Sequence, residues 1–168
     1  MTVDNEPVIR PAGLSDIEAM SRLYVEFHEF HVAGVPDRLR TLGEPQQKDW
    51  TRLHDALDKI LKDEQAQIFV AGCSEGLIGL VEVYLRQDDV ENPFIVAHRY
   101  GFVQSLMVGE LYRRGGTGRR LLDAAEAWAR DRGATEIRLD VWEFEAGPLN
   151  FYEKSGYRTL KRSLVRQF

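Results

Sequence analysis

Residues 105–122 read Ser-Leu-Met-Val-Gly-Glu-Leu-Tyr-Arg-Arg-Gly-Gly-Thr-Gly-Arg-Arg-Leu-Leu. The pattern predicts an apolar strand, a glycine-rich loop and then a helix. Gly115, Gly116 and Gly118 fall where the loop becomes the helix, and the first N–H groups of a helix have no partner within it. Glycines let such a backbone approach a bulky anion closely. The stretch therefore predicts a binding site for a diphosphate.

The spacing of these glycines narrows the identity of the diphosphate. A nucleotide-triphosphate loop has the pattern G-x-x-x-x-G-K-[ST], and no lysine follows the glycines here. In a dinucleotide fingerprint a third glycine would stand at Leu121. The arrangement that fits is R-x-x-G-x-G, at positions 113, 116 and 118. Four arginines surround the turn and are expected to pair with phosphate oxygens: Arg113, Arg114, Arg119 and Arg120.

Two motifs in this part of the chain resemble the GNAT superfamily of acyl-CoA-dependent N-acyltransferases. The R-x-x-G-x-G loop is similar to the acyl-CoA loop of that superfamily. Residues 146–157 resemble its later motif, A-x-x-x-x-x-Y-E-K-x-G-F/Y. The two occur in the family's order over about 105–160, with a helix and a strand between them. The run 141–152 also shows a weaker similarity to diamine and polyamine acetyltransferases.

This resemblance implies one N-acetyltransferase domain over residues 1–168, with a GNAT-like α+β fold. Its central sheet would be mixed and largely antiparallel, splayed to form a cleft for CoA, and flanked by helices on both faces. Acetyl-CoA would be the co-substrate. Main-chain groups of Leu106, Met107 and Val108 would pair with its pantetheine arm. Its diphosphate would be held by the amides of Arg113, Arg114, Gly115, Gly116, Thr117 and Gly118.

The same resemblance assigns Tyr152 a catalytic role. This residue matches the family tyrosine whose hydroxyl gives a proton to the departing CoA thiolate. A phenol with a pKa of about 10 is protonated at neutral pH and can act as a general acid. The family asparagine that contacts CoA is replaced by Glu145, so that contact is not carried over.

The general base departs from the family pattern. Many relatives carry a glutamate on the strand before the loop, but Gln104 stands there and cannot accept a proton. Glu82, on the preceding hairpin strand, is the base that we expect. Asp140, His98 and a chain of water molecules are the alternatives.

Hydrophobic periodicity predicts the order β-α-α-β-β-β-α-β-α-β. Strands are expected at 8–10, 68–73, 77–86, 100–108, 136–142 and 157–167. Helices are expected at 15–34, at 46–64, from the glycine loop to about 132, and at 148–155. Ser15 and Glu18 have the spacing of a capping box at the start of the first helix.

Composition excludes several classes of protein. A net charge of −5 over 168 residues argues against general nucleic-acid binding. The polar amino-terminal start and the lack of a long apolar run predict no signal peptide and no membrane span, hence a cytoplasmic protein. Cys73 is the one cysteine, so no internal disulfide can form. The histidines lack metal-ligand spacing, and we expect no metal.

The sequence thus predicts an N-acetyltransferase that moves an acetyl group from acetyl-CoA to a primary amine by direct attack in a ternary complex. The acceptor would be a small-molecule amine or a peptide amine. One alternative is a CoA-binding sensor or interaction module with weak or no catalysis, a reading that Gln104 favours. Another is a nucleotide-binding fold unrelated to CoA. An exposed edge strand, as in many relatives, would allow a homodimer.

Overall fold

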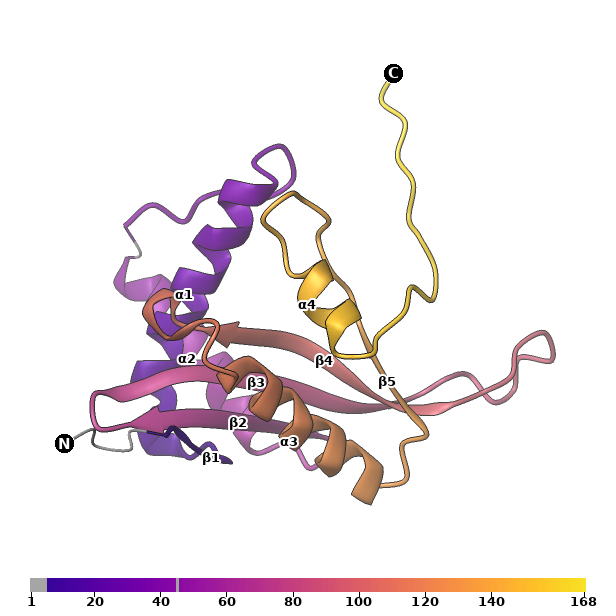
Figure 1. Cartoon of the computed structure of the whole chain (residues 1–168), viewed down its shortest axis with the longest axis horizontal. Helices are drawn as coiled ribbons and strands as arrows, with labels where there is room; N and C mark the ends of the chain where they lie inside the picture. Colours follow the sequence, from indigo (N-terminus) through magenta and orange to yellow (C-terminus); the bar gives the residue numbers. More distant parts are fainter. Residues whose placement is uncertain (1–5, 45) are drawn as a thin grey trace.

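A five-stranded sheet forms the middle layer of the described chain (Figure 1). The structure is a computed structural model that describes residues 6–44 and 46–168; most of the polar amino-terminal start, residues 1–5, lies outside it, as does Pro45. The strands lie in chain order: β1 (Val8–Pro11), β2 (Ala66–Cys73), β3 (Gly76–Gln87), β4 (Arg99–Val108) and β5 (Glu136–Leu139). Strands β1 to β4 are antiparallel, and β5 is parallel to β4. The expected mixed, largely antiparallel sheet is confirmed.

Helices cover both faces of this sheet, also as expected (Figure 1). The helical elements are η1 (Leu14–Asp16), α1 (Ile17–Gly34), α2 (Gln47–Leu61), η2 (Glu110–Tyr112), α3 (Thr117–Asp131) and α4 (Leu149–Lys154). Because side chains alternate along a strand, β3 supplies two cores. Val81 and Val83 pack with α3, whereas Leu80 packs with α1 and α2.

Helix α3 lies close to β4 because the two meet at small residues. A Cβ added at Gly101 would stand 2.7 Å from the Cβ of Ala129. The inward face of α3 is the one that its 3-4 spacing predicts: Leu121, Leu122, Ala125, Trp128 and Ala129 are all buried. The position of α3 is therefore fixed by packing along its whole length.

Strands β4 and β5 pair over four residues only. The register runs from Tyr100 opposite Glu136 to Val103 opposite Leu139. Beyond that point β4 continues to Val108, while the chain after Leu139 leaves the sheet. No described strand pairs with this side of residues 105–108. We call this separation the β4–β5 split, and it confirms the splayed sheet that was expected.

Two expected strands are wrong at the carboxy-terminal end of the chain. β5 ends at Leu139 instead of Trp142, because the neighbouring strand has already diverged and offers no ladder of hydrogen bonds. The strand expected at 157–167 does not form, and residues 158–168 are exposed without regular structure. Nothing in the described chain pairs with that segment.

The expected cap at Ser15 is also wrong. The chain turns earlier, at Gly13, whose N–H donates to the Asp16 carboxylate at 2.8 Å. Asp16 is fixed in turn by Arg10, through two hydrogen bonds of 2.7 and 2.8 Å. The turn therefore begins as the short helix η1, and α1 follows it at Ile17.

Candidate functional site

The loop between β4 and α3 presents a row of unused backbone amides. Within the described chain, no hydrogen bond uses the N–H groups of residues 114–119, and that of Arg120 donates to the Gly116 carbonyl at 3.1 Å. The row lies at the amino end of α3, where the helix dipole adds partial positive charge. Such an end can bind an anion that has several oxygen atoms.

The conformation of this loop depends on glycine. Gly116 has a φ of 84°, in the left-handed region that favours glycine, and Arg114 adopts a φ of 67°. A Cβ added at Gly116 would meet nothing within 4 Å, so the space beside it is open. At Gly118 an added Cβ would lie 3.5 Å from the Phe151 ring. Gly116 thus leaves room beside the amides, whereas a side chain at Gly118 would be in ordinary van der Waals contact with Phe151 of α4.

The structure divides the four arginines of the loop. Arg119 pairs with Asp123 at 2.7 Å, and Arg120 pairs with Glu6 at 3.0 Å. The guanidinium of Arg119 also donates to the Ser155 carbonyl at the end of α4, at 2.9 Å. Arg119 and Arg120 are therefore paired with groups of the protein. The remaining loop arginines that could pair with a phosphate are Arg113 and Arg114.

Arg113 lies across the end of β4. Its Nε donates to the Val108 carbonyl at 2.9 Å, and its guanidinium carbon lies 4.9 Å from the centre of the Phe30 ring. Glu26 of α1 is 3.9 Å from the same guanidinium, and it accepts the Glu110 amide at 3.0 Å. These contacts tie α1 to the loop, and they use the Val108 carbonyl that was expected to be free.

The other two residues of the expected pantetheine strand differ in burial. Met107 is buried in the core beneath α1 and α2, whereas the Leu106 side chain is half-buried and packs against the α3 core. Leu106 thus packs β4 against the α3 layer, and Met107 packs it against the layer of α1 and α2. The main chain of this segment borders the β4–β5 split.

Tyr152 is held at the start of α3 by the packing of α4. The residue is 7% exposed, and its ring lies 5.2 Å from that of Phe151 and 5.6 Å from that of Tyr157. Burial raises the pKa of Tyr152 to about 12. No hydrogen bond of its hydroxyl occurs with the rest of the described chain. The phenol is therefore protonated at neutral pH and available to a ligand.

Glu82 is a buried carboxylate with two phenols bound to it. It is 4% exposed; Oε2 accepts a hydrogen bond from Tyr24 at 2.6 Å, and Oε1 accepts one from Tyr84 at 2.5 Å. Tyr24 comes from α1, and Tyr84 lies two residues along β3 on the same face. Burial and the adjacent Glu82 raise the pKa values of both phenols. The two hydrogen bonds fix the orientation of the carboxylate.

A β-bulge sets the position of Glu82 relative to the split. Glu82 is opposite Ser105 and Val83 is opposite Val103, so Gln104 is the extra residue of β4. Gln104 is exposed. Because the pairing of β4 with β5 ends at Val103, Glu82 lies beside the point where the two strands separate.

The other candidate bases lie elsewhere. Asp140 is exposed directly after β5. His98 lies before the first residue of β4, where its N–H donates to Asp88 at 3.1 Å and its ring is 3.8 Å from Glu136. His98 is therefore at the end of β4 opposite to the glycine-rich loop. Glu145 is exposed in the segment before α4.

Sequence reasoning missed the phenols around Glu82 and an aromatic contact across the split. Phe144, which follows β5, lies 5.6 Å from Phe30 and 6.1 Å from His31 of α1, measured between ring centres. A Cβ added at Gly34 would be 2.5 Å from the Phe144 ring, so that glycine admits it. The alternation of side chains along β3 could have predicted that Tyr84 lies on the same face as Glu82. No sequence pattern indicated the contact of Phe144 with α1.

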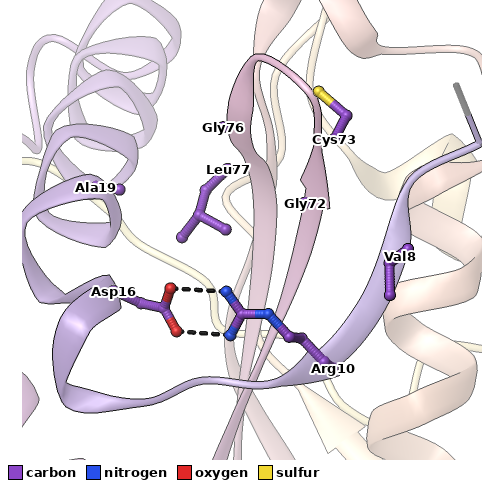
Figure 2. Close-up of a pocket in the computed structure, with 8 residues that line it drawn as sticks. All are labelled: Val8, Arg10, Asp16, Ala19, Gly72, Cys73, Gly76 and Leu77. Carbon is purple, nitrogen blue, oxygen red and sulfur yellow. Dashed lines mark hydrogen bonds and ion pairs between the residues drawn. The ribbon is translucent and has the colours of Figure 1, made fainter.

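A separate open hollow of about 430 Å³ lies between β1, the start of α1 and the β2–β3 turn (Figure 2). Its charged groups are paired, because Arg10 binds Asp16 through both guanidinium nitrogens. That pairing lowers the pKa of Asp16. Cys73 also lines the hollow, two strands away from β4. Because Arg10 is already paired with Asp16, the charged side chains of this hollow are less available to a ligand than the free amides of the glycine-rich loop.

Within residues 6–44 and 46–168, no group of three or more His, Cys, Asp or Glu residues is arranged to hold a metal ion. None of the helices in this part of the chain is long and apolar enough to cross a membrane.

Comparison with known proteins adds to this geometry. The profile of the Acetyltransferase (GNAT) family matches residues 19–157. An aminoglycoside N(6')-acetyltransferase type 1 from Stenotrophomonas maltophilia is 33% identical over 95 residues, which are 54% of this chain and 61% of that protein. The match thus spans less than two thirds of the relative.

Solved structures share the fold. A mutant of the BH1408 protein from Bacillus halodurans has a TM-score of 0.85 at 23% identity, over 96% of this chain and 99% of that chain. The aminoglycoside N-acetyltransferase AAC(6')-Iy in complex with CoA has a TM-score of 0.68 at 17% identity, over 96% and 98% of the two chains. At these identities the likeness concerns the fold.

The setting of Glu82 predicts an effect of Tyr24→Phe on stability. The change removes one of two hydrogen bonds to a buried carboxylate, so the free energy of unfolding should fall by about 1–3 kcal/mol. Urea unfolding measures this difference. Tyr112→Phe is the control, because its phenol binds the exposed Glu75 and its loss should cost less than about 1 kcal/mol. Equal effects of the two changes would contradict the role given to Tyr24.

Proposed function

Because this chain belongs to the GNAT family of acetyltransferases, we propose that it transfers the acetyl group of acetyl-CoA to a primary amine of a small, positively charged molecule. The amine attacks directly, with both substrates bound. One observation carries the proposal: the free amides of residues 114–119 lie at the start of α3, in the connection that follows the edge of β4 left unpaired by the split.

The residues of the loop and of β4 suit CoA in charge and in hydrogen bonding. The free amides and the Arg114 side chain are donors for a diphosphate, and each hydrogen bond to a charged oxygen contributes about 1.5–3 kcal/mol. Leu106, Met107 and Val108 offer main-chain groups to the amides of the pantetheine arm, as an added strand would use them. Arg113 exchanges its contact with the Val108 carbonyl for a phosphate oxygen.

Acetyl-CoA supplies a thioester carbonyl, and the reaction forms a C–N bond while the C–S bond breaks. The amine must first lose a proton, and Glu82 receives it through water, because Glu82 is the carboxylate that lies beside the point where β4 and β5 separate. The backbone N–H of the β4 end polarises the carbonyl. The products are an amide and a free thiol, so the proton lost by the amine balances the one gained by sulfur.

Tyr152 assists the departure of the sulfur. Its pKa of about 12 lies above the value of about 8.5 that is usual for a thiol, so the phenol keeps its proton at neutral pH. Its hydroxyl therefore stabilises the forming thiolate as a hydrogen-bond donor, and the sulfur takes its proton in the same contact or from water.

An aminoglycoside-like acceptor has the most support. The aminoglycoside acetyltransferase of Stenotrophomonas maltophilia is 33% identical over its matched part. Glu82 lies on the α1 side of the sheet, where its carboxylate would attract an ammonium group. Glu26 and Glu29 are already used, since they accept the amides of Glu110 at 3.0 Å and Leu42 at 2.9 Å.

Release of free thiol tests the proposed reaction. The protein is incubated with acetyl-CoA and a panel of aminoglycosides, diamines, amino acids and peptides, and free CoA is followed. We expect release that depends on an aminoglycoside or another polyamine. CoA binding without release for any amine would contradict the proposal and favour a sensor. Thermal protection by ATP or NAD in place of CoA would indicate an unrelated nucleotide site.

Gly116→Val should abolish the binding of CoA. Its side chain would fill the open space beside the free amides, and its φ of 84° adds strain of about 1–2 kcal/mol. Gly43→Val is the matched control, since Gly43 has a φ of 62°, is equally open, and lies in the α1–α2 connection. Calorimetric titration with CoA should distinguish them, although both lose stability. Normal binding by the Gly116 variant would reject the loop as the diphosphate site.

Tyr152→Phe should lower turnover about tenfold or more, with little change in the affinity for CoA. The ring still packs against Phe151, but the departing sulfur loses its hydrogen-bond donor. Steady-state thiol release and CoA titration measure the two effects separately. Tyr100→Phe, at the far end of β4, serves as the control and should leave turnover unchanged. Full activity of the Tyr152 variant would remove this hydroxyl from the mechanism.

Glu82→Gln should lower turnover by about 10²-fold or more, because an amide keeps the shape of the side chain but cannot take a proton. Asp140→Asn is the comparison, since Asp140 is the exposed carboxylate at the end of β5. Rates are measured from pH 6 to 9, with unfolding in urea as a check on stability. A loss confined to the Asp140 variant would move the role of base to that residue.

A further inference from the structure

Glu82 is enclosed on the α1 side of the sheet, although the proposed function requires it to take a proton. It is 4% exposed, and each of its carboxylate oxygens already accepts a hydrogen bond from a phenol. Its neighbour across the sheet on β2, Ile68, is apolar and 1% exposed. An amine bound in the β4–β5 split therefore has to reach this carboxylate through groups that both accept and donate a proton.

Ser105 lies between Glu82 and the split. It is opposite Glu82 in the register of β3 and β4, just beyond the point where β4 stops pairing with β5. Because side chains alternate along a strand, Ser105 faces the same side as Met107, which packs beneath α1 and α2. Glu82 faces that side too, since its partner Tyr24 belongs to α1. Ser105 is thus at the open edge of β4 and on the face that holds the carboxylate.

The phenol of Tyr24 connects these two side chains. Its hydroxyl donates to Glu82 Oε2 at 2.6 Å, and the Ser105 hydroxyl is a hydrogen-bond partner of the same phenol. A hydroxyl can accept one hydrogen bond while it donates another. Ser105, Tyr24 and Glu82 therefore form a continuous chain of hydrogen bonds from the open edge of β4 to a buried base.

The second phenol on Glu82 does not extend this chain. Tyr84 donates to Glu82 Oε1 at 2.5 Å, and it is opposite Phe102 in the register of β3 and β4. Phe102 is still paired with Arg138 of β5, so Tyr84 lies beside the closed part of the sheet. The path to the split therefore leaves Glu82 through Tyr24.

We propose that Ser105 and Tyr24 form a proton relay that carries the proton of the acceptor amine from the split to Glu82, an inference that rests on the proposed function. The ammonium proton passes through water to Ser105 Oγ. At the same time the hydroxyl proton of Ser105 passes to the Tyr24 oxygen, and the phenol proton passes to Glu82 Oε2. Ser105 and Tyr24 end neutral, Glu82 is protonated, and the amine has a free electron pair with which to attack the thioester.

The electrostatics of the cluster require such a concerted transfer. Burial and the adjacent Glu82 raise the pKa of Tyr24, so the phenol does not ionise at neutral pH and must gain one proton as it loses the other. The remaining charged groups, Asp63 and Arg86, act on Tyr84. Glu82 is therefore the group of the cluster that holds the transferred proton.

Replacement of Ser105 tests the relay. Ser105→Ala should lower turnover about tenfold or more at pH 7, with little change in the KM for acetyl-CoA, and Ser105→Thr should restore most of it by keeping a hydroxyl. Ser21→Ala is the matched control, because Ser21 is a buried serine of α1 whose hydroxyl donates to the Ile17 carbonyl at 2.8 Å. It should leave turnover unchanged. Thiol release measures the rates, and urea unfolding checks that each variant is folded.

The pH dependence separates a relay from a packing defect. An amine with a pKa of about 10 becomes increasingly neutral as the pH rises, and a neutral amine needs no relay. The deficit of Ser105→Ala should therefore shrink at least tenfold between pH 7 and pH 9. A deficit that stays constant over this range would indicate altered packing and overturn the relay.

A double variant tests whether the two hydroxyls act in one chain. Tyr24→Phe and Ser105→Ala interrupt the same path, so together they should lower turnover no further than the more damaging single change. Losses that multiply would overturn the relay. Tyr24→Phe should also lower turnover more than Tyr84→Phe; equal losses would show that both phenols only orient Glu82, and would overturn it too.

The unaltered chain distinguishes failure of the relay from failure of the proposed function. If it releases no thiol with any amine, the proposed function is wrong and the relay is wrong with it. If it releases thiol and Ser105→Ala does so equally fast at pH 7, the relay alone is wrong.

Discussion

The separation of β4 and β5 after Val103 determines which main-chain groups at the end of β4 have no partner strand. A parallel pair of strands normally satisfies its main-chain groups along its length, and here pairing stops after four residues. The end of β4 therefore has an edge that no described strand uses, and η2 and the glycine-rich loop connect it to α3. The split thus leaves an open sheet edge in the same part of the chain as the free amides of residues 114–119.

Packing around the split keeps this row in place without filling it. Helix α3 is fixed against β4 at Gly101, and Arg119 joins its first turn to the end of α4. On the other face, Arg113 and Glu26 connect the loop to α1. The loop itself stays in a costly conformation, with Arg114 in the left-handed region. Such strain persists only where neighbouring contacts determine the backbone, which is the case here.

Local sequence patterns predicted the parts of the fold that depend on local physics. The alternation of β3 and the 3-4 spacing of α3 are set by burial on one face, so those elements and their inward residues were found correctly. Strand alternation could have placed Tyr84 beside Glu82, but Tyr24 reaches Glu82 only because α1 packs on the sheet, and spacing within either element does not encode that. Glycine spacing located the loop, but the carboxylates that hold Arg119 and Arg120 required the folded structure. The strand expected at 157–167 failed because a strand pattern needs a partner edge, and no described segment supplies one.

The proposed role of Glu82 as the base depends on the bulge in β4. On β4, the family position of the base holds Gln104, which the bulge leaves exposed. The same bulge sets Ser105 opposite Glu82, so the carboxylate of Glu82 on β3 lies beside the position of Gln104 on β4. Burial there would penalise a lone charge, and the two phenols offset this by donating to both oxygens. One of those phenols belongs to α1, the helix whose carboxy-terminal end contacts Phe144 across the split. Helix α1 therefore contacts both Glu82, through Tyr24, and the segment after β5, through Phe30 and His31.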